Sequence, residues 1–222
     1  MVENFSWYTD KKEDFRKYAL GLEDTEVDAI LGCIPSGWNL PPISHRGFVE
    51  WLVKEIKPKV TVELGVDYGY SSFILALCQN NPVYGIDCFD DSIHDGRLDE
   101  DYDFVLAIKE KLKIDNLKII KSYFDDALNT WDKEIDLLHI DGLHDYDNCK
   151  HDCDTWAPLL NENGVILFHD TVSNPNGAGY FFNQLEVPKV NFHNSNGLGV
   201  ASNDVELIEK IKEKYFNQVK NS

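Results

Sequence analysis

Acidic and histidine side chains recur in this 222-residue chain at the points where short apolar segments end. Such segments are predicted strands, and in an open parallel sheet ligands bind outside the carboxyl ends of the strands. We therefore expect these side chains to gather along one edge of a sheet and to form a site there. The segment ends are Glu63-Leu64-Gly65, Asp87, Ser122-Tyr123, Asp141-Gly142 and His169-Asp170.

The turn after the first segment indicates which ligand that edge binds. It reads Val62-Glu63-Leu64-Gly65-Val66-Asp67-Tyr68-Gly69-Tyr70-Ser71. Glycines four residues apart let the backbone approach a ligand, and the helix predicted from Ser71 to Cys78 offers free N–H groups at its start. The spacing matches neither a dinucleotide-binding Gly-x-Gly-x-x-Gly turn nor a P-loop. Glu63 would repel a phosphate, but it suits a cation such as the aminoacyl sulfonium of S-adenosylmethionine (SAM).

Two further strand ends complete a predicted nucleoside site. Asp87 is spaced to accept both hydroxyls of a ribose, and Ser122 and Tyr123 close the third strand, where an adenine would lie. Tyr123 either stacks on that base or packs against the protein. The alternative is that Glu63 and Asp87 are caps in an unrelated α/β fold, but two acids and two glycines would then have to coincide. The predicted cofactor-binding residues are Glu63, Gly65, Gly69, Tyr70, Ser71, Asp87, Ser122 and Tyr123.

Three longer segments in the second half of the chain make the pattern more specific. They are Leu138-His139-Ile140-Asp141-Gly142-Leu143-His144-Asp145-Tyr146, Asp152-Cys153-Asp154-Thr155-Trp156-Ala157-Pro158-Leu159-Leu160 and Gly164-Val165-Ile166-Leu167-Phe168-His169-Asp170. With them, residues 44–203 resemble the class I SAM-dependent methyltransferases. The segments look like one branch of that family, which includes metal-dependent O-methyltransferases acting on macrolide sugars and on the cephem nucleus. The resemblance implies methyl transfer to a hydroxyl of a small molecule, a sugar or a glycosylated metabolite.

The resemblance also implies roles for four residues. Asp141 and Asp170 match ligands of a divalent metal, which is magnesium in that branch, and His144 matches the base. His169 departs from the pattern, because the family has an acid at that position. It would bind a metal through nitrogen, which favours an ion softer than magnesium, or a water would take its place. The predicted catalytic residues are His144 and Asp141, and the predicted metal ligands are Asp141, His169 and Asp170.

These residue types suit the implied chemistry. A sulfonium methyl group is already a good electrophile, so the protein must supply an aligned, deprotonated oxygen. Coordination to a divalent ion lowers the pKa of a hydroxyl, and a neutral imidazole accepts the proton at neutral pH.

Other interpretations of these residues stay open. Without the resemblance, His144 would be a loop histidine bonded to Asp145 or Asp147, and His139 a core or supporting residue. Acids of the following helix, Asp152 included, would favour the N-terminus of that helix. Two alternative functions remain: a small-molecule methyltransferase that needs no metal, and a non-catalytic module that binds SAM or a nucleotide. The glycine spacing disfavours a nicotinamide-dependent oxidoreductase.

The elements that must position these residues alternate between helix and strand from Ser44 onward. Strands that are apolar on both sides need a sheet covered on both faces. An Asn-Gly turn at Asn196-Gly197 predicts an antiparallel hairpin between residues 189–193 and 198–202. We therefore predict an α/β fold, a doubly wound and mostly parallel seven-stranded sheet with a C-terminal antiparallel hairpin. The five predicted parallel strands are Val60–Leu64, Val83–Ile86, Lys118–Ile120, Ile135–Ile140 and Val165–Phe168.

The first 43 residues differ from the rest of the chain. They combine aromatic and charged residues with a breaker-rich stretch, Pro35–Pro42, which fits neither a strand nor a long helix. We predict an N-terminal arm or lid over residues 1–43 and a SAM-dependent methyltransferase domain over residues 44–222.

Composition narrows the partners and the compartment. The chain has 21 Lys and Arg against 39 Asp and Glu, a net charge of −18, and its basic residues form no patch, so we expect no nucleic-acid partner. It has no signal-peptide pattern and no apolar run long enough to span a membrane. The five cysteines show no paired framework. We expect a cytoplasmic protein with a small-molecule hydroxyl substrate, and self-association into a homo-oligomer stays open.

Overall fold

The computed structural model describes residues 19–22, 27–34, 45–90 and 100–216. Most of the predicted N-terminal arm lies outside these ranges, so its role as a lid stays a prediction. One helix of the arm, α2 (Val27–Cys33), is described. It buries Ile30 and Leu31 in the main hydrophobic core, so this part of the arm packs on the domain.

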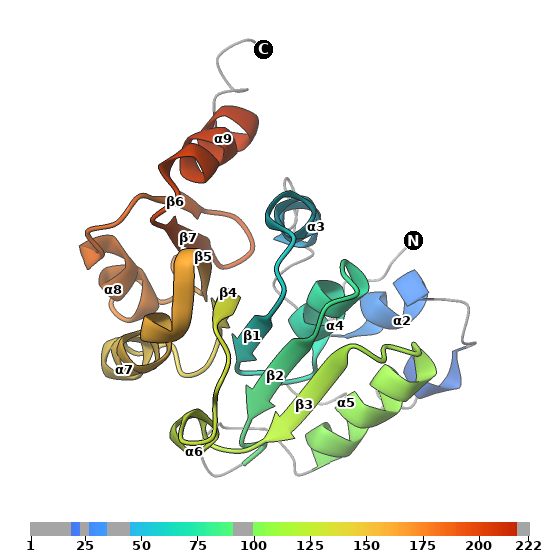
Figure 1. Cartoon of the computed structure of the whole chain (residues 1–222). Coiled ribbons are helices and arrows are strands. Elements are labelled where there is room, and N and C mark those ends of the chain that lie inside the picture. Colours follow the sequence, from blue (N-terminus) through green and yellow to red (C-terminus); the bar gives the residue numbers. More distant parts are fainter. Residues whose placement is uncertain (1–18, 23–26, 35–44, 91–99, 217–222) are drawn as a thin grey trace.

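The main domain is built on one seven-stranded sheet (Figure 1). The strand order is β3-β2-β1-β4-β5-β7-β6. The first five strands pair in parallel, whereas β7 is antiparallel to both β5 and β6. The predicted sheet with its C-terminal antiparallel hairpin is confirmed. The strands are β1 (Thr61–Leu64), β2 (Val83–Asp87), β3 (Leu117–Lys121), β4 (Ile135–Ile140), β5 (Leu160–His169), β6 (Lys189–Phe192) and β7 (Leu198–Ser202).

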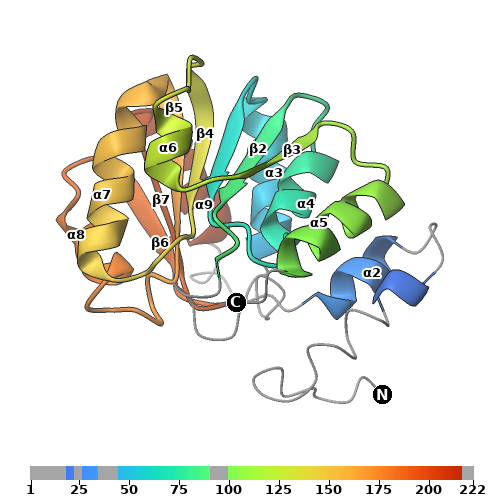
Figure 2. The ribbon, with the colours of Figure 1, turned by 90° about the horizontal axis from the view of Figure 1, so that it is seen from below.

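Helices cover both faces of the sheet (Figure 2). One cluster of buried apolar side chains lies under α3, α4, α5 and α9, and a second lies under α6, α7 and α8. Val62 and Leu64 of β1 belong to the second cluster, so Glu63 between them points to the α3 face. None of the described helices combines the length and the apolar character needed to cross a membrane. The helices are α3 (His45–Ile56), α4 (Tyr70–Leu77), α5 (Glu100–Lys111), α6 (Phe124–Leu128), α7 (Tyr146–Trp156), α8 (Ala178–Gln184) and α9 (Val205–Tyr215).

One helix boundary differs from the prediction. The helix expected over residues 148–160 ends at Trp156, and β5 already begins at Leu160. Between them a 3₁₀ turn holds Pro158, which lacks an amide hydrogen and therefore does not continue α7.

Candidate active site

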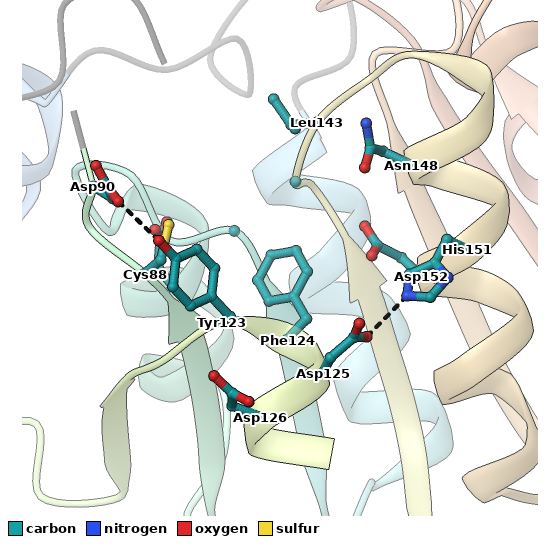
Figure 3. Close-up of a pocket in the computed structure, with 13 residues that line it drawn as sticks. Cys88, Asp90, Tyr123, Phe124, Asp125, Asp126, Leu143, Asn148, His151 and Asp152 are labelled. Carbon is teal, nitrogen blue, oxygen red and sulfur yellow. Dashed lines mark hydrogen bonds and ion pairs between the residues drawn. The ribbon is translucent and has the colours of Figure 1, made fainter. Parts of the chain in front are cut away.

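A cavity of about 440 Å³ opens where β1 and β4 lie side by side in the middle of the sheet. The chain leaves these two strands toward helices on opposite faces, which creates a crevice at their carboxyl ends. Figure 3 shows Cys88 and Asp90 on one side of the cavity, Asn148 and Asp152 on the α7 side, and Phe124 between them. The lining consists of Gly65, Asp87, Cys88, Asp90, Tyr123, Phe124, Asp125, Asp126, Gly142, Leu143, Asn148, His151 and Asp152.

The two glycines of the first turn are required by close contacts within the protein. Gly65 has φ 94°, and a Cβ there would lie 2.1 Å from the carbonyl oxygen of Asp141. Gly69 has φ 82° and precedes α4, where a Cβ would lie 2.8 Å from the ring of Phe73. Left-handed backbone of this kind favours glycine. Gly65 thus lines the cavity and also lets the ends of β1 and β4 meet.

Asp87 fixes the first turn and faces the cavity. Its Oδ2 accepts hydrogen bonds from the backbone N–H groups of Val66 at 2.8 Å and Asp67 at 3.1 Å. Its Oδ1 accepts from the N–H of Phe89 at 2.8 Å. Asp87 thus presents at the cavity a carboxylate, a group that accepts hydrogen bonds from hydroxyls.

Glu63 lies behind the cavity. It is fully buried, accepts a hydrogen bond from the hydroxyl of Ser72, and is 2.7 Å from Nδ1 of His139 through its Oε1. Tyr70 and Ser71 are buried in the first turn of α4. Among the described residues, those that line the cavity include none of these three predicted cofactor residues.

Of the two predicted cofactor-binding residues after β3, one lines the cavity and the other does not. Tyr123 lines the cavity with 49% of its surface exposed, and its hydroxyl donates to Oδ2 of Asp90 at 2.8 Å. Ser122 is not among the described lining residues, and its hydroxyl donates to the carbonyl of Tyr123 at 3.0 Å. Tyr123 is therefore the residue of this pair that can contact a base.

A histidine–aspartate cluster, defined as Asp141, His144, His169 and Asp170, lies beside the cavity at the ends of β4 and β5. Oδ1 of Asp141 is 3.1 Å from Nε2 of His144 and 3.0 Å from Nδ1 of His169. The Asp170 oxygens lie 3.4 Å and 3.5 Å from the same two nitrogens. Since a carboxylate only accepts, these nitrogens carry the hydrogens. The structure brings all four predicted residues together and pairs His144 with Asp141 rather than with Asp145 or Asp147.

Two further imidazoles flank this cluster. His139 is fully buried; it donates Nδ1–H to Glu63, and its Nε2 lies 3.9 Å from Oδ2 of Asp141. His45, the first residue of α3, packs edge-on against His169 with 5.8 Å between ring centroids. Through His139, Glu63 is connected to the cluster rather than to the cavity.

The charges in the cluster shift the pKa values of its members. Burial disfavours the charged form of His169, but Asp141 and Asp170 outweigh it and raise the pKa of His169 to about 9. Burial also opposes ionisation of Asp141, yet His169 and His144 hold its pKa well below the usual range. The pKa of His144 is raised because its bond to Asp141 outweighs burial. Burial, with His169 adding to it, lowers the pKa of His45 to about 3, so His45 is neutral.

The cluster has the atoms that a divalent ion needs. Asp141, His144 and His169 each offer one ligand atom, and these atoms lie within 4.8 Å of one another. Oδ1 of Asp170 is buried and has no hydrogen-bond partner among the described residues. Asp170 also has φ 58°, a conformation that ordinary residues adopt rarely and that recurs at functional sites. Carboxylates with imidazoles fit a divalent ion, and the nitrogens favour a transition metal over magnesium.

The structure places here three residues for which the sequence predicts no site role. They are His45, Asp90 and Asp152. Asp152 does not serve the start of its helix as expected, because that place is taken by Asp145, whose Oδ1 accepts from the N–H of Asn148 at 3.1 Å. The spacing of Cys149 and Trp156 marks the buried face that Asp152 shares, and this was the available signal. His45 and Asp90 reach the site only through tertiary packing.

Comparison with known proteins agrees with this geometry. A family model described as a methyltransferase domain matches residues 62–171. A methyltransferase from Geobacter sulfurreducens has a TM-score of 0.62 and 15% identity, covering 87% of this chain and 97% of that one. An O-methyltransferase from Bacillus cereus, solved in complex with SAH (S-adenosylhomocysteine), has a TM-score of 0.59 and 16% identity, covering 90% and 94%. Similarity at these identities shows a shared fold.

One curated relative is more similar in sequence. The uncharacterized protein y4gI of Sinorhizobium fredii (strain NBRC 101917 / NGR234) is 32% identical over 182 residues. The match covers 76% of this chain and 20% of that protein, so the chain spans about a fifth of the relative's length. The family model runs from β1 to the residue after Asp170, and so includes every described lining residue of the cavity and the whole cluster. Residues 62–171 therefore form a methyltransferase domain, and the chain has the class I SAM-dependent methyltransferase fold.

Proposed function

We propose that the chain is an O-methyltransferase that moves a methyl group from SAM to a hydroxyl of a small molecule. The observation that carries this proposal is the shared end of β4. Gly142 and Leu143 line the cavity, while Asp141 and His144 belong to the histidine–aspartate cluster. A nucleoside donor in the cavity and a hydroxyl at the cluster would therefore lie next to each other.

The cavity has the groups to hold the donor. Asp87 presents an acid for ribose hydroxyls, and Tyr123 presents an exposed ring for a base. The backbone turn at Gly65 lies against Asp141, so the sulfonium end of a donor held by this turn would lie beside the cluster. When bound, SAM supplies an electrophilic methyl group, and its transfer to oxygen breaks the carbon–sulfur bond and releases SAH. Glu63 contributes its charge from behind the turn.

Asp141 and His144 form a pair suited to accept the hydroxyl proton. Asp141 accepts the Nε2–H of His144, which leaves Nδ1 with the lone pair that receives the proton. The same carboxylate then stabilises the imidazolium, as in other aspartate–histidine pairs. The His144 side chain is 22% exposed, the most accessible of the cluster, so an acceptor reaches it first.

A divalent ion fits beside this pair, with Asp141, His169 and Asp170 as the proposed ligands. When bound, such an ion supplies Lewis acidity that lowers the pKa of a coordinated hydroxyl. Magnesium takes oxygen ligands, whereas the nitrogen of His169 suits manganese, cobalt or zinc. Of the two expectations from the sequence, the geometry supports the softer ion better than magnesium.

One observation favours a second version of the reaction, without a metal. His144 and His169 already donate to Asp141 at 3.1 Å and 3.0 Å, and the charge of His169, whose pKa is raised to about 9, offsets that of a carboxylate. Activity that survives EDTA would identify this version. Loss of activity with EDTA and its recovery with manganese or magnesium would identify the metal-assisted one.

The acceptor class and the compartment are proposed from the family resemblance, the net charge and the cysteines. A sugar or glycosylated hydroxyl follows from the resemblance, and the net charge of −18 disfavours a polyanion such as nucleic acid. The four cysteines whose side chains are described are all free, which fits a reducing compartment such as the cytoplasm.

A transfer assay tests the proposed function. The chain is incubated with methyl-labelled SAM and a panel of monosaccharides, glycosides and catechols, and labelled product and SAH are measured. We expect turnover that falls about 10²–10⁴-fold in His144→Ala and is unchanged in Asp147→Asn, an exposed acid of the same region. SAH binding without any turnover would instead indicate a non-catalytic module.

A further inference from the structure

Asp152 differs from the other acids of the cavity. It lies in the second turn of α7, is 5% exposed and lines the cavity. Within the described residues its carboxylate makes no hydrogen bond or ion pair. Asp87, the other buried acid in the lining, accepts three backbone hydrogen bonds. A buried carboxylate without a partner costs free energy, so Asp152 requires an explanation.

The polar neighbours of Asp152 are engaged elsewhere. Nε2 of His151 is 2.8 Å from Oδ1 of Asp125 on α6. The side-chain amide of Asn148 donates to Oδ2 of Asp145 at 2.7 Å. No described side chain is therefore placed to satisfy the carboxyl group of Asp152.

The carboxyl group of Asp152 is kept open to the cavity by Gly142. A Cβ at Gly142 would lie 2.8 Å from the ring of Phe124 and 3.3 Å from Oδ2 of Asp152, so a side chain there would fill the space between them. Figure 3 shows Asp152 on the α7 side of the cavity, across Phe124 from Cys88. Burial raises the pKa of Asp152 to about 7, with His151 opposing and Asp125 adding to the shift. Near neutral pH the carboxyl group therefore both accepts and donates hydrogen bonds.

The position of Asp152 matches one part of the donor. Asp87 directly precedes Cys88, which lies across Phe124 from Asp152 in the cavity. A nucleoside with its ribose at Asp87 would therefore reach α7 with its base by extending across the cavity, past Phe124. The adenine edge offers an amine that donates beside a ring nitrogen that accepts, and a carboxyl group complements both. We propose that Asp152 recognises the adenine of SAM by accepting a hydrogen bond from its exocyclic amine. This inference rests on the proposed function.

The test compares two ligands and three forms of the protein by calorimetry. The ligands are SAH and its purine analogue, in which hydrogen replaces the exocyclic amine. We expect the wild-type chain to bind SAH about ten- to a hundredfold more tightly than the analogue. Asp152→Ala should lose this preference, whereas Asp152→Asn, whose amide also accepts and donates, should keep most of it. Asp154→Ala, which removes an exposed acid of the same helix that does not line the cavity, should leave the preference unchanged.

The outcomes separate this inference from the proposed function. A wild-type chain that binds neither ligand contradicts the proposed function itself. A wild-type chain that binds SAH but shows no preference, or an Asp152→Ala chain that keeps the wild-type preference, overturns the role of Asp152. Thermal melts without ligand give a second readout. Removing an unpaired buried acid should raise the melting temperature, whereas a structural role would lower it.

Discussion

The two edges of the sheet carry acids of the same kind but use them differently. At the amino ends of the strands, a groove of about 600 Å³ is lined by acids that include Asp136 and Asp204, and both of these have backbone partners. Oδ2 of Asp136 accepts from the backbone N–H groups of Lys59 and Val60, both at 2.8 Å, and Asp204 caps α9. At the carboxyl ends, Asp141 faces imidazoles and Asp152 faces a cavity.

This difference separates structural acids from functional ones. An acid that accepts backbone N–H groups lowers the free energy of the folded state, because those groups would otherwise be unpaired. An acid held against a titratable ring or an open cavity gives up some of that stability and remains available to a ligand. Acidic composition alone does not distinguish the two edges, whereas the partners of each carboxylate do.

The largest expected effect is the loss of activity in Asp141→Asn. The amide no longer stabilises the charged form of His144 and is a poorer metal ligand, so kcat/KM should fall about 10³-fold or more. The assay is the labelled-methyl transfer described above. Circular dichroism should show an unchanged fold. An activity within tenfold of wild type would remove Asp141 from the site.

Asp136→Ala, at the amino ends of the strands, should lower the stability of the protein and leave its activity unchanged. It leaves two backbone N–H groups without their acceptor, so the free energy of unfolding should fall by about 1–3 kcal/mol. Urea denaturation measures this change, and the methyl-transfer rate of the folded protein should stay at the wild-type level. A loss of activity without a loss of stability would contradict the claim that the acids at the amino ends of the strands are structural.

The unpaired, buried carboxyl group of Asp152 predicts a stability difference between the wild-type chain and Asp152→Asn that depends on pH. Its pKa is raised on folding, to about 7, so the folded chain binds this proton more tightly than the unfolded chain does. The corresponding stability is present below the unfolded pKa and is lost as pH rises toward 7. Asp152→Asn removes this dependence and should therefore melt higher than wild type, by a larger margin at about pH 8 than at about pH 5. A margin that shrinks with rising pH would contradict the raised pKa.

The smallest expected effect is at Asp204, which accepts from the N–H of Leu207 at 2.9 Å and caps α9. Asp204→Ala should cost about 1 kcal/mol of unfolding free energy, and Asp204→Ser should recover most of it. Methyl transfer should be unchanged in both. Denaturant titration resolves a change of this size when the two variants are compared directly.

Most of the sheet could be predicted from the sequence. The short apolar runs predict parallel strands, because each run is apolar on both sides. The polar residues that follow these strands must then lie together, since the carboxyl ends of parallel strands share one edge of the sheet. This reasoning brought Asp141, His144, His169 and Asp170 together correctly. The predicted boundary between α7 and β5 was wrong because the 3₁₀ turn that holds Pro158 ends the helix at Trp156.

The environment of individual side chains was harder to predict. Glu63 was expected to face a cationic ligand, but the pairing of β1 with β4 places it beside His139, where it is fully buried. That contact depends on strand register between segments 76 positions apart, which a local pattern does not contain. Asp152 was misjudged because its charge suggested a role at the N-terminus of its helix, whereas its spacing placed it on the buried face of α7.

A crystal structure of the chain with SAH tests the central claim most directly. We expect the ribose hydroxyls at Asp87, the adenine between Tyr123 and α7, and the sulfur beside Asp141 and His144. SAH bound at another surface, or an SAH sulfur on the far side of the cavity from the histidine–aspartate cluster, would contradict the account.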